Sequence, residues 1–291
     1  MRYYTESDTL FICGSFRAAS TGINGGIRSV STLLNHRSDP NQNPAAAAKE
    51  LEIAVAGAGI GPDYFGLLTG VSAGQACVLQ YDFITVFITA AIRREGAGEP
   101  AAITILVTSS EGMSDAALLD AIMVGTEAKT EALLAAGLPL TGTPADSVLV
   151  ACEGAERHCS AGRATEAGKR VREAVLYGIQ EALTRHDTAV KSARPAFFIF
   201  SRFKGEHWIP WEPDNCPYYP CHFEGQSCDF CYCPFYPCRD ESLGQWTKSS
   251  TNGRVWNCAR CTLLHEPAVA AYLKRYPRAS REELVRASRK T

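Results

Sequence analysis

Residues 216–238 read CPYYPCHFEGQSCDFCYCPFYPC, a stretch with six cysteines in 23 residues and two near-identical hexapeptides, CPYYPC and CPFYPC. Tyrosine, proline and glycine are abundant in it, whereas the aliphatic side chains that build a hydrophobic core are nearly absent. A small domain with so little apolar surface cannot stabilise itself by burial alone. The stretch therefore indicates a fold that depends on cysteine chemistry.

The cysteines are unevenly distributed along the chain. Of the twelve, four lie in the first 190 residues and eight lie between positions 216 and 261. This asymmetry predicts two domains: a first domain at 1–186, a polar linker at 187–196 and a small cysteine-rich domain at 197–291. The four early cysteines are Cys13, Cys77, Cys152 and Cys159.

The spacing of the later cysteines indicates metal binding. A C-x2-C turn brings two thiolates to one tetrahedral ion, and two such pairs, Cys228/Cys231 and Cys258/Cys261, are expected to share one site. The remaining thiols, with His222 or His265 as substitutes, are sufficient for a second site. We expect zinc at both, although cysteine ligation also fits an iron–sulfur cluster and disulfides are a further alternative. The remaining thiols are Cys216, Cys221, Cys233 and Cys238.

Length and composition limit the classes of function. The chain has 291 residues, is 46% hydrophobic and has a formal charge of −2, which gives no electrostatic reason to expect a nucleic-acid partner. Neither a membrane-spanning apolar stretch nor a secretory signal is evident, so we expect a cytoplasmic protein.

From Lys274 onward, seven Lys and Arg accompany two Glu. This basic tail is either a solvated helix face or a docking surface for a protein partner; the oligomeric state is open.

The first domain shows interleaved strand and helix patterns. Short apolar, β-branched runs predict strands, and 3.6-residue periodicity with capping residues predicts helices. Because the two kinds do not strictly alternate, the pattern predicts a layered α/β or α+β domain with a mixed sheet. The expected strands are 8–14, 27–34, 76–92 and 101–108, and the expected helices are 45–57, 114–137 and 163–185.

Residues 197–266 resemble the family called the cysteine-rich small domain. The matching pieces are FFIFSRF, CPYYPCH, CDFCYCPFYPC and CARC followed by His265. The resemblance implies a metal-binding module. Because the family often ends in C-x2-C-x2-3-H, it also makes His265 a candidate ligand.

Residues 10–185 resemble the adenosylcobinamide amidohydrolase family. Seven pieces occur in the family's order: FRAASTGINGGI, LLNH, TGVSAG, TVFITA, MSDAALLDAIMVGTEAKTEAL, TGTPADSVLVAC and CSAGRATEAG. The resemblance implies a corrinoid substrate and hydrolysis of the amide that joins aminopropanol to the corrin ring of adenosylcobinamide. The product would be adenosylcobyric acid, which re-enters coenzyme B12 synthesis in cobinamide salvage.

Amide hydrolysis requires proton transfer and stabilisation of an oxyanion. His36 falls in the matched LLNH motif and is the candidate general base or acid. Glu127 follows the apolar half of a predicted helix, where burial would raise its pKa, although a solvated helix face explains it equally well. Asp146 could orient a histidine or the leaving ammonium, or simply bond its own turn.

Substrate contacts are expected from two kinds of residue. The turn at Asn24, Gly25 and Gly26 could offer backbone N–H groups to an oxyanion or to corrin amides, and the matched motifs add Asn35, Thr126 and Thr143. The loops at 91–102 and 143–146 depart from the family pattern. They support the alternative of a non-catalytic corrinoid-binding or metal- or redox-sensing protein derived from this family.

Overall fold

The computed structural model divides the chain into two compact units. Residues 1–4 and 212–291 form one unit and residues 5–211 form the other. The residues described are 1–39, 42–92, 102–188, 194–202, 205–211, 216, 218–231, 233–248 and 254–289. Most of the divergent loop at 91–102 and the central part of the expected linker lie outside these ranges.

A mixed β-sheet of ten strands organises the larger unit. Its path runs β12-β11-β5-β6-β7-β9-β2-β3-β4, and the tenth strand, β1 (Arg2–Glu6), is divided between the units. Three neighbouring pairs, β11–β5, β7–β9 and β3–β4, are parallel, and the other pairs on the path are antiparallel. The other strands on the path are β2 (Thr9–Ser20), β3 (Gly26–Arg37), β4 (Tyr64–Thr69), β5 (Cys77–Tyr81), β6 (Ile84–Ala91), β7 (Ala102–Ser109), β9 (Ser147–Cys152), β11 (Ala196–Ser201) and β12 (His207–Trp211).

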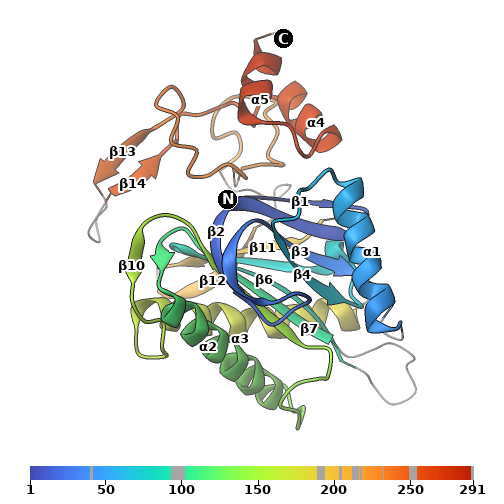
Figure 1. Ribbon diagram of the computed structural model, residues 1–291. Helices are drawn as coiled ribbons and strands as arrows, with labels where there is room; N and C mark the ends of the chain where they lie inside the picture. Colours follow the sequence, from blue (N-terminus) through green and yellow to red (C-terminus); the bar gives the residue numbers. More distant parts are fainter. Residues whose placement is uncertain are drawn as a thin grey trace. The chain divides into compact units, whose positions relative to one another are not determined.

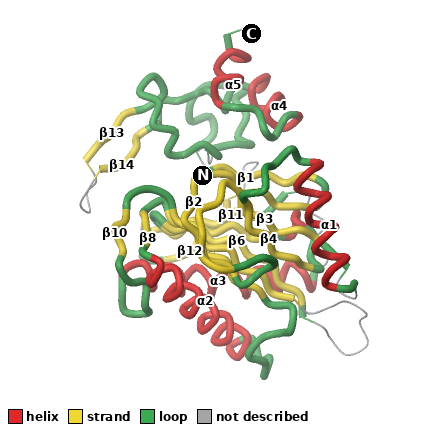
Figure 2. Tube along the Cα trace, in the orientation of Figure 1, coloured by secondary structure: helices red, strands yellow, loops and turns green. Residues whose placement is uncertain are grey.

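Helices cover both faces of this sheet (Figure 1). Helices α2 (Asp115–Ala135) and α3 (Glu166–Asp187) pack on one face, where alternate residues of β5, β6, β7 and β9 form the main hydrophobic core. Helix α1 (Pro44–Gly57) lies against β3 and β4 on the other side (Figure 2). Gly66 allows this approach, because a Cβ there would lie 2.4 Å from Leu51 of α1. A 3-10 turn (Ala73–Gln75) and a two-stranded ribbon of β8 (Gly112–Met113) and β10 (Glu156–His158) complete the unit. The predicted α/β class with a mixed sheet is confirmed.

Several local predictions are also confirmed. Ser114 caps α2 by accepting a hydrogen bond from Ala117 N, and Gly137 follows the helix with φ of 76°. The expected strand at 8–14 is longer than predicted, because residues 15–20 continue β2 instead of forming a turn. A register shift between Cys13 and Phe16 keeps β2 paired with β3 along this length.

The hairpin β11–β12 belongs to the larger unit, which corrects the expected boundary at residue 197. β11 pairs in parallel with β5, and Phe198 enters the main core. Trp208 stacks on Tyr177 at 5.3 Å, and Phe200 stacks on Tyr81 at 3.9 Å. The apolar run at 196–201 therefore extends the open edge of the sheet, where it buries more apolar surface than the cysteine-rich segment could offer.

The smaller unit contains little regular structure. It has the hairpin of β13 (Gln245–Lys248) and β14 (Arg254–Asn257) and two short helices, α4 (Pro267–Arg275) and α5 (Arg281–Ser288). Helix α5 begins with a capping box formed by Ser280 and Glu283. A small apolar cluster surrounds α4 and α5; its buried members are Leu263, Leu264, Val269, Leu273, Ala279 and Leu284.

Candidate functional site

The strand β3 carries two candidate residues that point to opposite sides. Asn35 is buried between sheet layers, where its Nδ2 donates to Thr89 Oγ1 at 3.1 Å and Thr104 Oγ1 at 2.8 Å. Thr89 is hydrogen-bonded in turn to Thr104 at 2.6 Å and to Thr69 at 3.2 Å. Asn35 Oδ1 is buried and meets no hydrogen-bond partner among the residues that the structure describes. These contacts fix the position of the residue that precedes His36.

His36 is a buried imidazole whose two nitrogens have different surroundings. Nδ1 lies 2.7 Å from Thr9 Oγ1, on the neighbouring strand β2. Nε2 has no hydrogen-bond partner within the described residues and lies 3.5 Å from Glu50 Oε1 on α1. Glu50 is about half exposed and also lies 3.4 Å from Ser38 Oγ. A fixed imidazole with one uncommitted nitrogen beside a carboxylate is the arrangement that general acid–base chemistry requires.

Glu50 is a residue that sequence reasoning missed. It lies in the run AAAAKELEIAVAG, where it reads as an ordinary polar position of an amphipathic helix. Only the packing of α1 against β3 places its carboxylate beside His36. No spacing signal connects positions 36 and 50, so the sequence alone gave no means of finding the pair.

Asp146 is largely but not completely buried, and its carboxylate is engaged by donors from its own unit. Its carboxylate accepts from Thr143 N and Oγ1, from Ile103 N, and from Lys129 Nζ at 2.5 Å. Gly142, with φ of 157°, gives Lys129 room, because a Cβ there would lie 2.5 Å from Nζ. Asp146 and Thr143 are therefore brought together, and the contacts tie the loop at 143–146 to α2 and β7.

Removing the cation of this buried pair should destabilise the fold. Lys129 and Asp146 have side chains only 7% and 11% exposed, so Lys129→Met would leave a buried carboxylate without its counter-charge. We expect the free energy of unfolding to fall by about 3 kcal/mol, and Lys129→Met with Asp146→Asn to recover part of that loss. Urea unfolding measures both values. A change below about 1 kcal/mol for Lys129→Met, at the level of exposed pairs, would contradict this prediction.

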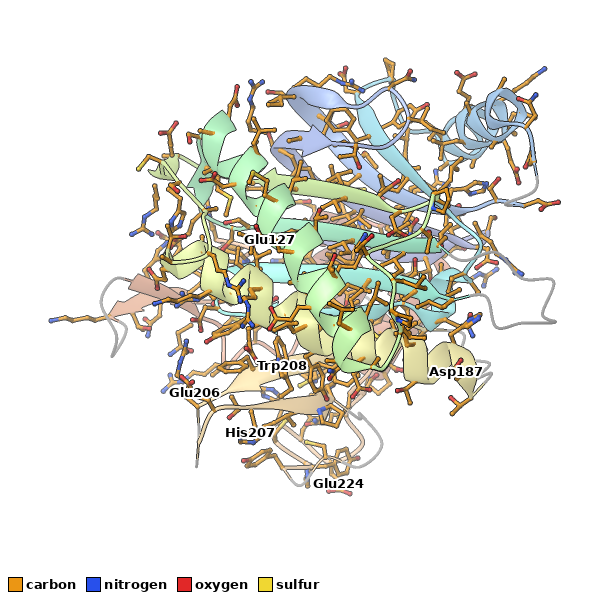
Figure 3. The ribbon with its side chains drawn as sticks, turned by 90° about the horizontal axis from the view of Figure 1, so that it is seen from below. Glu127, Asp187, Glu206, His207, Trp208 and Glu224 are labelled. Atoms are coloured by element: carbon orange, nitrogen blue, oxygen red, sulfur yellow. The ribbon has the colours of Figure 1, made fainter. Side chains whose placement is uncertain are left out.

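Glu127 lies on the exposed face of α2 (Figure 3). Thr126, its neighbour in the sequence, is also exposed. Of the two alternatives for Glu127, the solvated helix face is the one that the structure shows. The period of the helix turns Ala128 and Lys129 inward instead, and the Lys129 Nζ pairs with the Asp146 carboxylate. The catalytic role of Glu127 and the substrate contact of Thr126 stay predictions.

Asn24, Gly25 and Gly26 form the exposed turn between β2 and β3. Asn24 adopts φ of 53° and Gly26 adopts φ of 111°, a region that suits asparagine and glycine. Gly26 and His36 lie at opposite ends of β3, ten residues apart, which is roughly 33 Å along a strand. The turn and His36 thus do not form one compact site.

The eight later cysteines fall into two neighbourhoods. Burial and, to a smaller extent, the neighbouring thiols of Cys221, Cys228 and Cys216 together raise the pKa of Cys231 to about 11. Burial likewise raises the pKa of Cys233 to about 12, with contributions from Cys238, Cys261 and Cys258. We call these sets the first thiol quartet (Cys216, Cys221, Cys228, Cys231) and the second thiol quartet (Cys233, Cys238, Cys258, Cys261).

Local hydrogen bonds support the first thiol quartet. Gln226 is buried, and its Nε2 donates to Cys221 Sγ at 3.2 Å and to Cys228 Sγ at 3.3 Å. The turns Cys228–Cys231 and Cys258–Cys261 are each closed by a backbone hydrogen bond. The neighbours of each turn differ, since Cys231 lies near Cys216 and Cys221 whereas Cys258 and Cys261 lie near Cys233 and Cys238. The expected sharing of one metal site by the two turns stays a prediction.

Two histidines, His222 and His265, are the other candidate metal ligands of this unit. His222 and His265 contact each other, with ring centroids 4.3 Å apart, and His265 Nδ1 lies 3.0 Å from Ser227 O. None of the twelve cysteines, all of which lie in the described ranges, forms a disulfide bond. Across the described parts of the chain, no three Cys, His, Asp or Glu side chains stand at metal-binding geometry. The quartets thus supply the donor type and number for tetrahedral ions, and binding would require the thiols to close in.

The basic tail is partly neutralised within its own unit. Lys274 pairs with Asp229 at 2.5 Å, and Arg281 lies 3.4 Å from Asp240. Within the described residues, no helix combines the length and the apolar character that crossing a membrane requires. Docking of a protein partner at the tail stays a prediction.

Comparisons with known proteins agree with this organisation. A model of the adenosylcobinamide amidohydrolase family matches residues 9–191, and a model of the cysteine-rich small domain matches residues 207–288. An adenosylcobinamide amidohydrolase of Methanosarcina mazei is 35% identical over an alignment of 199 residues, and the match covers 63% of this chain and 98% of the relative. Another, from Halobacterium salinarum, is 29% identical over 192 residues, 60% of this chain and 82% of the relative.

The cysteine-rich segment has relatives of its own. A probable cobalt-factor III C(17)-methyltransferase of Methanothermobacter thermautotrophicus is 49% identical over 63 residues, 21% of this chain and 17% of the relative. The amidohydrolase match, in contrast, covers more than half of the chain and nearly the whole Methanosarcina protein. The protein therefore belongs to the adenosylcobinamide amidohydrolase family.

Proposed function

We propose that this protein hydrolyses the amide between aminopropanol and the corrin ring of adenosylcobinamide, giving adenosylcobyric acid for cobinamide salvage. Two relatives that bear this activity in their names match the larger unit. The observation that carries the proposal is the buried His36, with Nε2 uncommitted and 3.5 Å from the Glu50 carboxylate. It supplies the base that attack of water on an amide needs.

In the proposed reaction, Nδ1–H of His36 donates to Thr9 Oγ1, whose hydroxyl can donate to Ser7 O at 3.4 Å. This tautomer leaves the lone pair of Nε2 free. Nε2 takes a proton from water as the water oxygen bonds to the amide carbon. The same proton then passes to the leaving nitrogen as the carbon–nitrogen bond breaks, and Glu50 stabilises the imidazolium in between.

The role of Glu127 can be tested against this mechanism. If Glu127 is a general acid or base, Glu127→Ala lowers the release of aminopropanol by more than about 100-fold. A near-wild-type rate would remove Glu127 from the catalytic residues and leave His36 with Glu50. Glu131→Ala is the matched control for the loss of a helix carboxylate, because Glu131 binds Arg172 and is not assigned to the reaction.

We further propose that each thiol quartet binds one zinc ion and that these ions stabilise the smaller unit. Four thiolates suit tetrahedral zinc, and Gln226 donates to two sulfurs as outer-shell groups do in metal sites. The small apolar cluster around α4 and α5 supports the need for further stabilisation. An iron–sulfur cluster is the competing occupant, and the colour of anaerobically purified protein distinguishes the two.

A further inference from the structure

The smaller unit contains two copies of one short pattern. Each copy begins with a hexapeptide, CPYYPC at 216–221 or CPFYPC at 233–238, and ends with a C-x2-C turn. Six residues separate the two parts in the first copy and nineteen in the second, where the hairpin β13–β14 lies between them. We call these copies the first repeat (216–231) and the second repeat (233–261), and each contains the thiols of one thiol quartet.

The two hexapeptides adopt the same backbone turn. Tyr219 N donates to Cys216 O at 3.2 Å, and Tyr236 N donates to Cys233 O at 3.0 Å. The two C-x2-C turns are also alike, because in each the N–H of the second cysteine bonds to the carbonyl of the first, at 3.2 Å and 2.9 Å. Similar local sequence is enough to explain this likeness, since such turns depend on neighbouring residues.

The hydroxyl of the second tyrosine makes a contact that local sequence does not explain. Tyr219 Oη accepts from Gly225 N at 3.2 Å, just before the first C-x2-C turn. Tyr236 Oη donates to Trp256 O at 3.1 Å, just before the second C-x2-C turn. The partners lie 6 and 20 residues along the chain from their tyrosines. The same tertiary arrangement is therefore formed twice, across connections of different length.

A buried N–H group also occupies the same place in both repeats. Gln226 and Trp256 each stand two residues before a C-x2-C turn, and their exposed fractions are 6% and 3%. Gln226 Nε2 donates to Cys221 Sγ and Cys228 Sγ. Trp256 Nε1 meets no hydrogen-bond partner among the described residues. Each repeat thus places an N–H donor before its turn, and such donors are typical of the groups that surround metal ligands.

We infer that the smaller unit is built from two copies of one metal-binding repeat, in which Tyr219 and Tyr236 are equivalent positioning residues. Each hydroxyl joins the hexapeptide, with two thiols, to the segment that leads into the C-x2-C turn, with the other two. Thiols from two separate segments are thereby held together before an ion binds, which lowers the conformational entropy lost on binding. The inference rests on the proposed zinc sites and assigns one positioning residue to each.

Tyr219→Phe and Tyr236→Phe test this assignment in the full-length, zinc-loaded protein, since phenylalanine keeps the ring and removes only the hydroxyl. A chelator is titrated under reducing conditions, and the thiols that lose zinc are alkylated and located by peptide mass spectrometry. We expect Tyr219→Phe to weaken zinc binding at the first thiol quartet about fivefold, the effect of one hydrogen bond, and to leave the second unchanged. Tyr236→Phe should give the converse result.

Tyr218→Phe is the matched control, because it converts CPYYPC into the CPFYPC of the second repeat and Tyr218 is 73% exposed. It should leave zinc binding at both quartets unchanged. Equal exposure of all eight thiols in either test variant, as a general loss of stability would give, would overturn the assignment, and so would wild-type affinity at both quartets. Failure of the proposed zinc sites looks different: wild-type protein would then hold no zinc, and all eight thiols would be alkylated without chelator.

Discussion

His36→Gln should lower the turnover number for adenosylcobinamide by more than about 100-fold, the usual contribution of a general acid or base. Glutamine has a similar size and keeps hydrogen-bonding atoms near Thr9, but it cannot accept a proton at the position of Nε2. The imidazole is buried and its Nδ1 is held at 2.7 Å from Thr9 Oγ1, so other groups cannot easily replace it. Release of aminopropanol under saturating substrate measures the effect.

The accompanying variants separate chemistry from folding. Glu50→Gln keeps the shape of the side chain but removes the charge beside Nε2, so it should reduce turnover less than His36→Gln does. His207→Ala should retain the wild-type rate, because His207 is exposed on β12 (Figure 3). If His36→Gln protein with a wild-type melting temperature turned over normally, the assignment of the base would be wrong.

Metal removal should unfold the smaller unit while the larger unit stays folded. We expect two zinc ions per chain, and a chelator under reducing conditions should release both, because the binding free energy of a structural ion is also folding free energy. Two measurements check this result. The near-ultraviolet circular dichroism of the aromatic residues at 212–291 should be lost, and the larger unit should still show its cooperative unfolding transition in urea. If the purified protein is brown and contains iron, an iron–sulfur cluster and not zinc occupies the thiol quartets.

Cysteine variants distinguish the pairing observed in the structure from the pairing expected from spacing. Cys221→Ser with Cys228→Ser lies within the first thiol quartet and should cost one zinc ion, whereas Cys228→Ser with Cys258→Ser crosses the quartets and should cost both. The spacing-based pairing predicts the reverse result. Cys159→Ser should keep two ions, because Cys159 is an exposed thiol of the larger unit. Retention of tertiary structure after complete metal loss would contradict a stabilising role.

Much of the larger unit could be predicted from local sequence. Strong periodicity and caps such as Ser114 specify helices through contacts a few residues away. The mixed-sheet class followed from the order of these elements. The boundary at residue 197 was misplaced because composition changes there gradually, and only pairing with β5 shows that the strand at 196–201 completes the sheet.

The sequence by itself determined the element types, the family to which the chain belongs and the cysteine supply of the smaller unit, because these depend on residue identity and short-range spacing. The tertiary structure alone decided which distant groups meet: Glu50 with His36, Lys129 with Asp146, and Cys228 with Cys221 instead of Cys258. Such pairs depend on how helices and turns pack across many residues. Burial then selects the partners, since a buried charge or polar atom costs free energy unless a specific neighbour compensates it.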